Sequence, residues 1–464
     1  MMRKILFLMM AAIWGPLSLS TVGAADQEYP GGKSYMYRLY LTDKNGTSYR
    51  IDRPEAFLSK KAIERRKKQH LQIDVTDLPQ PEAYLKQITL TGGEILCKSK
   101  WNNTVLVRVK DTMTVQRLGD LPFVSRTMKV WASPDTVALK KRDRVQNTLG
   151  EKEHHPGSYY GAAELQINML NGKPLHQAGF KGKGITIAVF DGGFMNVDQV
   201  PALKKIKVIG THDVVPTPSS GLYVDHDHGT RVLSCIGANE PDYIVGTAPE
   251  ASFWLIRSED NYTETLAEED YWAAAAEFAD SVGVDVINSS LGYQDFDGNE
   301  GDHLYRELNG HTALISCTAS MLADKGIILC NSAGNDGMGM WKKINFPADA
   351  ENILTVGAVN SARKNASFSS VGPSADGRVK PDVMALGSGA ATITGRGAIS
   401  FDMGTSFSSP IMAGMVACLW QALPNKTAKE IMDLVRQSAH QYDYPDNVFG
   451  YGIPDFQKAW KAGQ

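Results

Sequence analysis

Three side chains with the chemistry of an orienting acid, a general base and a nucleophile occur in the order Asp191, His228 and Ser406. A serine hydroxyl becomes a strong nucleophile when a histidine takes its proton, and a carboxylate can orient and stabilise that histidine. Asn335 lies between the histidine and the serine, and a side-chain amide can donate to a developing oxyanion. Asp, His, Ser is also one of the orders in which unrelated folds arrange such a triad. We therefore predict Asp191, His228 and Ser406 as a catalytic triad and Asn335 as an oxyanion donor.

Each triad residue stands where a strand or a helix would position it. Asp191 directly follows the apolar run 185–190, and His228 precedes an apolar helical run. Ser406 comes shortly before Pro410, which fits only an early helical turn, so the serine is expected at a helix N-terminus. Free backbone N–H groups and the helix dipole favour negative charge there. The backbone N–H of Ser406 is therefore a second candidate oxyanion donor.

Taken one at a time, these residues also fit structural roles. Asp191, Thr405 or Ser406 could cap a helix, and Asn335 could form a turn beside glycine. Residues 225–228 (Asp-His-Asp-His) could bind a metal, because alternate loop residues can chelate. No third cluster with ligand spacing accompanies them, so we predict no metal site. Only the combination of all four residues in one chain favours catalysis over these readings.

The elements that would position these residues indicate a parallel sheet. Uniformly apolar strands separated by helices imply a parallel sheet covered on both faces, and the active site of such a sheet lies at the carboxyl ends of the strands. We predict a doubly wound, mainly parallel α/β domain with helices near 273–281 and 314–323. The apolar runs are 185–190, 206–209, 253–256, 284–287, 327–330 and 353–359.

A separate pattern precedes this domain. Four strand-like runs and intervening helical stretches predict a small α+β unit. The basic run 60–68 is predicted to be a solvated helix face, with an interaction role as the alternative. The predicted strands are 35–41, 94–99, 104–110 and 124–130, and the predicted helices are 58–70, 81–88 and 112–118.

The chain divides into four segments. Residues 1–24 have the basic start, the apolar run and the small-residue end of a signal peptide, so we expect export to the periplasm, the cell surface or the medium. The apolar run is too short for a membrane anchor. The α+β unit occupies 28–131, and the predicted catalytic domain occupies 158–464. Between them, residues 132–157 form a polar linker with a Lys-Lys-Arg cluster at 140–142, and we expect a processing site there.

Composition limits the partners of the protein. The net charge of −3 over 464 residues gives no reason to expect a nucleic-acid partner. No segment after the signal is long and apolar enough to cross a membrane, and we expect a monomer. The chain has 5 cysteines, an odd number, so at least one is unpaired within the chain. Most lie in apolar runs, which favours buried thiols, and a Cys317–Cys330 disulfide stays open.

Four motifs resemble those of one peptidase family. Residues 228–230 (His-Gly-Thr) are similar to its histidine motif, and residues 404–406 (Gly-Thr-Ser) with Pro410 are similar to its serine motif. Residues 333–335 (Ala-Gly-Asn) resemble its oxyanion motif, and residues 288–292 (Asn-Ser-Ser-Leu-Gly) resemble the strand that lines its substrate cleft. On these motifs the chain resembles the subtilisin-like serine peptidases over roughly residues 158–460.

The resemblance implies a serine endopeptidase that hydrolyses peptide bonds through an acyl-enzyme. It implies an N-terminal propeptide that assists folding and inhibits the enzyme until it is cleaved. The expected partners are protein or peptide substrates and the chain's own propeptide. No cofactor is expected for the chemistry, and structural calcium stays open. The resemblance also implies these substrate-binding residues: Ser290, Leu291, Gly292, Ala333 and Gly334.

Three positions depart from the family pattern. Arg231 stands where a second histidine is frequent, Gly192 follows the aspartate where Ser or Thr is commoner, and Leu386 replaces the proline of an Ala-Pro-Gly turn. None of these changes removes a catalytic atom. They leave the substrate preference open.

Two other functions compete with this interpretation. A serine esterase would show Gly-x-Ser-x-Gly and an aspartate before a C-terminal histidine, and the chain shows neither. A catalytically silent binding module on the same fold should have lost a triad or oxyanion residue, and all four are present. We therefore predict a peptidase.

Overall fold

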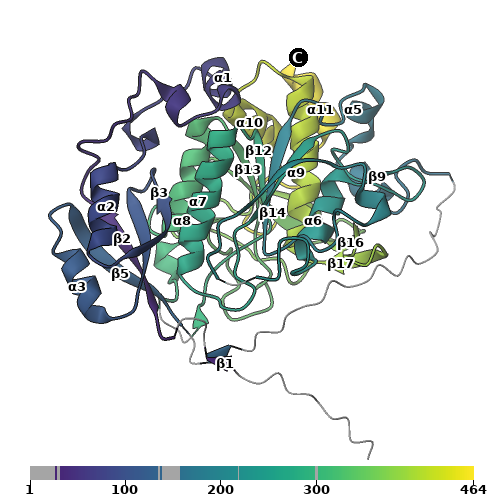
Figure 1. Cartoon of the computed structure of the whole chain (residues 1–464). Helices are drawn as coiled ribbons and strands as arrows, with labels where there is room; N and C mark the ends of the chain where they lie inside the picture. Colours follow the sequence, from purple (N-terminus) through teal and green to yellow (C-terminus); the bar gives the residue numbers. More distant parts are fainter. Residues whose placement is uncertain (1–26, 29–31, 134–135, 138–156, 218, 298–300) are drawn as a thin grey trace, which may run out of the picture.

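A seven-stranded parallel sheet forms the centre of the molecule, in a computed structural model that describes residues 27–28, 32–133, 136–137, 157–217, 219–297 and 301–464 (Figure 1). Its strand order is β15-β14-β13-β12-β7-β11-β8, and every neighbouring pair is parallel. The strands are β7 (Thr186–Asp191), β8 (Lys207–Asp213), β11 (Ser252–Arg257), β12 (Val286–Ser289), β13 (Ile328–Ser332), β14 (Leu354–Val359) and β15 (Val383–Leu386).

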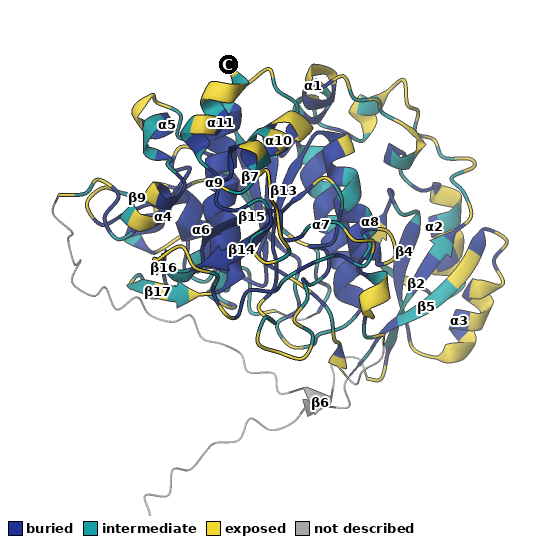
Figure 2. Cartoon of the chain, turned by 180° about the vertical axis from the view of Figure 1, so that it is seen from behind, coloured by how far each residue is buried: buried dark blue, intermediate teal, exposed yellow. Residues whose placement is uncertain are grey.

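Helices cover both faces of this sheet, which confirms the predicted doubly wound α/β fold. On one face lie α6 (His228–Gly237) and α9 (Thr405–Ala422), and on the other lie α7 (Ala267–Val282) and α8 (Leu314–Met321). Figure 2 shows α9 as a buried helix between the sheet and its neighbours. The helices that pack against α9 from outside are α10 (Ala428–Ser438) and α11 (Phe456–Gly463).

Strand β7 illustrates why both faces need cover. Successive side chains of the strand point to opposite sides of the sheet. All its residues are buried, because helices cover both sides. Ile187 and Val189 join the core that contains α6 and α9, whereas Ala188 and Phe190 join the core that contains α7 and α8. A strand with two buried faces must be apolar throughout, and this explains the apolar run in the sequence.

Shorter elements connect these layers. The β16-β17 hairpin leads directly into α9, and the β9-β10 hairpin follows α6. The remaining elements of this domain are α4 (Glu164–Met169), α5 (Lys173–Gln177), β9 (Asn239–Glu240), β10 (Ile244–Val245), β16 (Ser388–Ile393), β17 (Ile399–Met403) and the 3-10 turns η3 (Pro201–Leu203), η5 (Tyr305–Glu307) and η6 (Leu322–Lys325).

The N-terminal unit is a four-stranded antiparallel sheet with the order β3-β4-β2-β5. One face packs with its helices α2 and α3, and the other packs on α7 and α8 of the larger domain (Figure 1). The predicted small α+β unit is thus present. Its elements are β2 (Tyr35–Leu41), η1 (Pro54–Ala56), α1 (Lys60–Lys68), η2 (Val75–Asp77), α2 (Glu82–Leu90), β3 (Glu94–Ser99), β4 (Thr104–Val109), α3 (Thr112–Gly119) and β5 (Val124–Ala132); β1 (Gln27–Glu28) pairs with β6 (Thr136–Val137).

The prediction that the basic run 60–68 is a solvated face is wrong in part. Arg65 and Arg66 of α1 are buried, and both pair with Asp280 of α7, Arg66 at 2.8 Å. Arg66 also pairs with Asp77 at 2.8 Å. Helical spacing places these two arginines toward the larger domain, and the acidic partner that makes their burial tolerable lies more than two hundred residues away.

Two predictions about the sheet need correction. The run 206–209 was expected to be a fully buried strand, but β8 is an edge strand with alternating exposed and half-buried residues. Strand β15 was not predicted, although its four residues are all apolar. It completes the sheet on the opposite edge.

The open question of a disulfide is settled by the fold. All five cysteines are free, and Cys235, Cys330 and Cys418 are buried thiols as expected. Cys330 lies inside β13, while the Cys317 thiol on α8 donates to a backbone carbonyl. The Cys317–Cys330 disulfide is therefore not formed.

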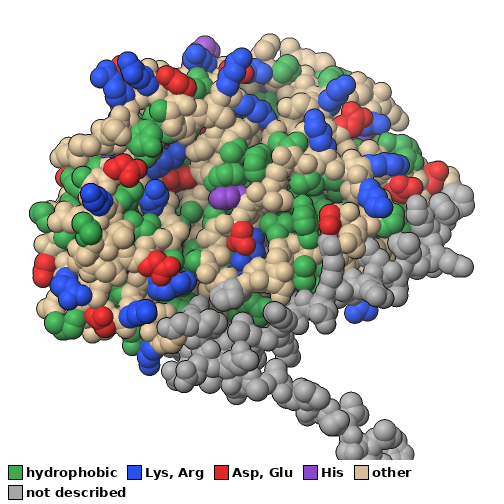
Figure 3. All heavy atoms as spheres, viewed as in Figure 1, with side chains coloured by type: hydrophobic (Ala, Val, Ile, Leu, Met, Phe, Trp, Pro, Cys, Tyr) green, Lys and Arg blue, Asp and Glu red, His purple; other side chains and the backbone are tan. Residues whose placement is uncertain are grey.

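Two further predictions concern export and partners. The predicted signal peptide, residues 1–24, and most of the predicted linker 132–157 lie outside the described residues. Of the helices that are described, none has the length and apolarity required to cross a membrane. Over the face seen in Figure 3, acidic and basic side chains are interspersed.

Candidate active site

The structure brings the predicted site residues together at the carboxyl ends of the strands, where ligands bind in open α/β sheets. Asp191 ends β7, residues 290–292 follow β12, and residues 333–335 follow β13. Ser406 lies in the first turn of α9. A cavity of about 620 Å³ is lined by Asp191, His228, Ser290, Leu291, Gly292, Gly334, Asn335 and Ser406, among others.

Asp191 and His228 form a hydrogen-bonded pair. His228 Nδ1 lies 2.8 Å from Asp191 Oδ2, and the other carboxylate oxygen accepts from the Gly192 N–H at 2.9 Å. Asp191 is almost fully buried, with 1% of its surface exposed. Burial of the imidazole lowers the pKa of His228, but the charge and hydrogen bond of Asp191 and the charge of Glu259 raise it to about 9. The pair therefore stabilises the imidazolium form.

Gly229 allows α6 to start against the end of β7. A Cβ atom at this position would lie 2.4 Å from the Gly193 carbonyl oxygen and 2.8 Å from the Asp191 Cβ. The Gly229 N–H donates to that same carbonyl at 3.1 Å. Only glycine permits this approach, which sets the distance between His228 and Asp191.

Two hydrogen bonds between Ser406 and Ser290 hold Ser406 at the N-terminus of α9. Pro410 lies inside α9 rather than in its first turn, and it has no N–H to donate to the carbonyl of Ser406 one turn earlier. The Ser290 hydroxyl donates to that carbonyl instead, at 2.8 Å. The Ser406 hydroxyl donates to the Ser290 carbonyl at 3.3 Å, and no hydrogen bond within the described part of the chain joins it to His228. Such contacts often tighten only when substrate binds.

Asn335 is oriented by Thr405, whose role the sequence did not reveal beyond helix capping. The Asn335 side-chain oxygen accepts from the Thr405 N–H at 2.9 Å and from its hydroxyl at 3.0 Å. The same hydroxyl accepts from the Gly334 N–H at 3.2 Å. With its oxygen held in this way, Asn335 has its amide N–H groups left to donate to a bound group. In the sequence, the position of Thr405 next to the candidate nucleophile was the feature that could have indicated this role.

Four of the five predicted substrate-binding residues line the cavity, namely Ser290, Leu291, Gly292 and Gly334. Ala333 does not; it is buried, and its N–H donates to Val356 of the neighbouring strand. Gly292 is exposed, and in the described part of the chain its backbone makes no hydrogen bond. An open backbone edge of this kind can pair with an extended peptide.

Arg231, one departure from the family pattern, explains part of the charge at residues 225–228. It bridges Asp227 and Asp402 of β17, with a nitrogen–oxygen distance of 2.9 Å to each. Asp225 accepts from the Ser220 N–H. These carboxylates are thus engaged by the protein itself, and the arrangement does not favour the metal alternative for this segment.

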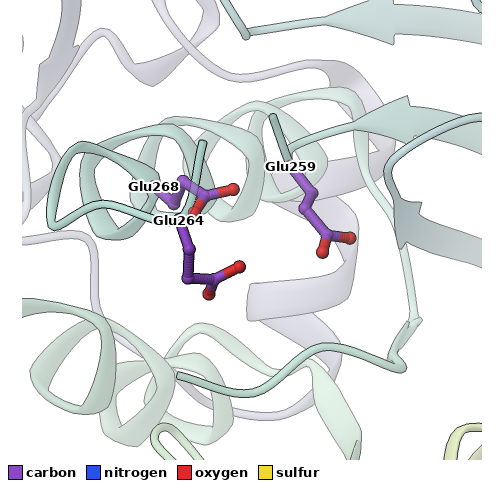
Figure 4. Close-up of side chains that lie close together, drawn as sticks. All are labelled: Glu259, Glu264 and Glu268. Atoms are coloured by element: carbon purple, nitrogen blue, oxygen red, sulfur yellow. The ribbon is translucent and has the colours of Figure 1, made fainter. Parts of the chain in front are cut away.

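A different cluster has the ligand atoms of a cation site, and the sequence analysis missed it. Carboxylate oxygens of Glu259, Glu264 and Glu268 lie within 4.8 Å of one another, beside the triad (Figure 4). Glu268 is fully buried, and the other two are half-buried. The residues follow β11 and begin α7 with a spacing that matches no metal motif, so only the fold brings them together.

Sequence comparisons define the class of protein. A sequence model of the Subtilase family, Peptidase S8, matches residues 182–452, which is more than half of the chain. A second model, the Peptidase S8 propeptide domain of Bacteroidota, matches residues 36–148. The chain belongs to the subtilase family: it is a serine-type endopeptidase with an N-terminal propeptide domain.

Curated relatives agree with this assignment. Subtilisin NAT of Bacillus subtilis subsp. natto is 30% identical over 65% of this chain and 72% of its own length. Subtilisin E of Bacillus subtilis strain 168 is 29% identical over the same shares. Serine protease AprX of the same strain is 29% identical over 58% of this chain and 65% of its own length.

Proposed function

We propose that this subtilase hydrolyses peptide bonds with Ser406 as nucleophile, His228 as general base and Asp191 as the residue that orients the base. The observation that carries the proposal is the hydrogen bond of 2.8 Å between His228 Nδ1 and Asp191, made in the cavity that Ser406 also lines. This bond sets the tautomer of the imidazole and leaves Nε2 to accept the serine proton.

The reaction then follows from the groups present. Ser406 attacks the peptide carbonyl carbon while its proton passes to His228, and a tetrahedral oxyanion forms. The Asn335 amide and the Ser406 backbone N–H donate to this oxyanion. His228 gives the proton to the leaving amine, and the acyl-enzyme forms. Water then attacks the acyl carbonyl carbon while His228 takes its proton, and His228 returns this proton to the Ser406 oxygen as the acid product leaves. No cofactor is needed, because the chain supplies the nucleophile, the base and the oxyanion donors.

The N-terminal unit, residues 28–131, is proposed to inhibit the enzyme until it is cut from the catalytic domain within residues 132–157. Its last strand supports this role. Residues 128–132 of β5 and the cleft residues Thr263 and Asp297 line one continuous cavity. The chain that follows β5 therefore starts at the edge of the cleft. Export through the signal-like residues 1–24 would precede this step.

A fluorophosphonate tests the proposed nucleophile. It reacts with a serine hydroxyl only when a base and an oxyanion site activate that serine, so we expect one phosphonyl group per processed molecule, attached to Ser406. Mass spectrometry of the digested protein locates the label. His228→Ala is expected to abolish the labelling. A label on another serine, or none on the folded protein, would remove the basis of the proposal.

The activity should rise toward alkaline pH. His228 must be neutral to accept a proton, and its pKa is raised to about 9, so kcat/KM should increase with pH through that value. Glu259→Gln removes a negative charge that stabilises the imidazolium, and the rising limb should move to lower pH. Exposed Glu250→Gln is the matched control and should leave it in place. Profiles of kcat/KM against pH on an uncharged peptide measure this shift. If the rising part of the profile lies at the same pH in Glu259→Gln as in the wild type, the expectation is contradicted.

A further inference from the structure

The cavity at the triad is rich in carboxylates, and no Lys or Arg occurs among the described residues that line it. Most of these carboxylates are engaged by the protein: Asp191 by His228, Asp260 by the Tyr262 N–H and the Thr263 hydroxyl, Asp297 by the Glu264 N–H, and Asp336 by Asn345. Glu259 and Glu264 differ, because within the described part of the chain neither side chain accepts a hydrogen bond or forms an ion pair. Among the described residues that line the cleft, they are the two acidic side chains without such a partner.

Glu268 and Tyr293 lie close to this pair. The two oxygens of Glu268 accept from the Asp260 N–H at 2.8 Å and from the Thr265 N–H at 3.1 Å, so this carboxylate fixes the loop that carries Glu259 and Glu264. Tyr293 is 2% exposed, and its hydroxyl has no hydrogen-bond partner. Burial, and then the charges of Glu268, Glu259 and Glu264, raise the pKa of this hydroxyl. An unpartnered buried hydroxyl therefore accompanies two unpartnered carboxylates.

Such a group of acids is costly without a positive charge beside it. Burial and the charge of Asp191 raise the pKa of Glu259 to about 7. Burial and the charge of Glu259 raise the pKa of Glu264 to about 8. Both carboxylates would ionise fully once a cation lay between them. The charges of His228 and Arg257 lower the pKa of Glu259, but burial and Asp191 outweigh them, so the site favours a further cationic group.

The donor set fits an ammonium or guanidinium group better than a metal ion. Calcium takes six to eight oxygen ligands. Here Glu268 is already bound to two backbone N–H groups, and among the described residues of this cluster only Glu259, Glu264 and the neutral Tyr293 hydroxyl remain. Two carboxylates in an open cleft match the several N–H donors of a Lys or Arg side chain.

The substrate would deliver such a side chain to this place. Residues 290–292 line the same cavity as Glu259 and Glu264, so a peptide paired with that backbone edge passes the two carboxylates. The chain's own linker has the matching charge, since residues 140–142 read Lys-Lys-Arg. That linker follows β5, which ends beside the cleft.

We infer that Glu259 and Glu264 form a subsite for a Lys or Arg side chain of the substrate, on the side of the scissile bond that pairs with residues 290–292. The inference rests on the proposed function, because it needs a peptide bound at Ser406. It assigns a preference for basic residues to this enzyme, both in its substrates and in its own linker.

Peptides that differ at one position test the subsite. Mature wild-type enzyme is given fluorogenic peptides in which each position on either side of the cut carries Arg, Lys or norleucine in turn. We expect one position at which Arg or Lys raises kcat/KM by about 10- to 100-fold over norleucine, the size of a hydrogen bond to a charged group. Glu259→Gln, Glu264→Gln and the double variant should reduce that ratio toward 1 while norleucine peptides are still cut. Glu250→Gln should keep the full ratio.

The outcomes separate the inference from the proposed function. If the wild type cuts peptides but favours no basic position, or if the Gln variants lower the rates on Arg and norleucine peptides equally, the subsite is refuted and the triad stands. If calcium raises the Tm of the wild type but not that of Glu264→Gln, with the same Arg preference in both, the cluster is a metal site and the subsite is refuted. If the folded wild type cuts no peptide at all, the proposed function itself fails.

The linker gives an independent measurement. N-terminal sequencing of the mature wild-type protein should place the cut beside residues 140–142, and replacing all three with Gln in the full chain should slow processing. A cut at an uncharged sequence that is unaffected by this change contradicts the inference.

Discussion

Ser406→Ala should lower kcat on peptide substrates by about 10⁶-fold, the size found for the triad serine of a subtilisin. The substitution removes the atom that forms the acyl bond, and no other described group in the cavity stands in its place. What activity remains would come from binding and the oxyanion donors. The fold should persist, because the lost hydroxyl contributes only one hydrogen bond of 3.3 Å to Ser290.

The same variant should accumulate as a full-length precursor. If the chain cuts its own linker, an enzyme without the nucleophile cannot do so, and mass spectrometry should find the precursor intact when no other protease is present. Ser438→Ala is the matched control, since Ser438 is a buried helical serine of α10 with one backbone hydrogen bond. It should process normally and keep its activity.

Two outcomes would overturn this expectation. A folded Ser406→Ala protein with a near-normal rate would show that Ser406 is not the nucleophile. A Ser406→Ala precursor cut at the wild-type bond and rate would show that another protease performs the maturation. Circular dichroism and thermal melting of both proteins establish that the variant is folded.

Asn335→Ala should lower kcat by about 10²- to 10³-fold with little change in KM, the size reported for the equivalent donor in a subtilisin. The amide is used mainly when charge develops on the carbonyl oxygen, so its loss affects the transition state more than the bound substrate. Steady-state kinetics on one good peptide substrate measures the two constants separately. A rise in KM at constant kcat would make Asn335 a binding or turn residue instead.

Thr405 offers a control for the position of this amide. Its hydroxyl holds the Asn335 oxygen at 3.0 Å. Thr405→Val should therefore lower kcat by less than Asn335→Ala does, and Thr405→Ser should restore most of the loss, because it keeps the hydroxyl. If Val and Ser variants behave alike, the hydroxyl does not position the amide.

The amino-acid sequence by itself determined the local parts of this protein. Runs of apolar residues predicted the parallel sheet, since a strand buried on both faces has to be apolar along its whole length. Asp191, His228, Asn335 and Ser406 could be selected because each stands next to a strand or helix end, where the chain order and the flanking glycines and proline are visible. Strand β15 is also apolar throughout, and it was missed.

Only the tertiary structure decided which distant groups meet. The sequence of α1 gave no sign that Arg65 and Arg66 are buried, because their partner Asp280 lies on another domain. Cys317 and Cys330 are free because β13 and α8 place their thiols apart from each other. Whether a charged side chain is solvated or paired depends on where the oppositely charged residue lies. In the same way, whether a thiol is free or forms a disulfide depends on where the second cysteine lies.

The cleft shows the same division. Glu259, Glu264 and Glu268 read as ordinary acidic residues before and within a helix, and a surface helix start favours acids for its dipole alone. The turn after β11 folds them to within 4.8 Å of one another beside His228. There burial and neighbouring negative charges raise the pKa of all three. The periodicity of apolar residues in a sequence indicates which face of a helix or strand is buried. It does not indicate which loops meet at the edge of a sheet, and the acidic character of the cleft arises where these loops meet.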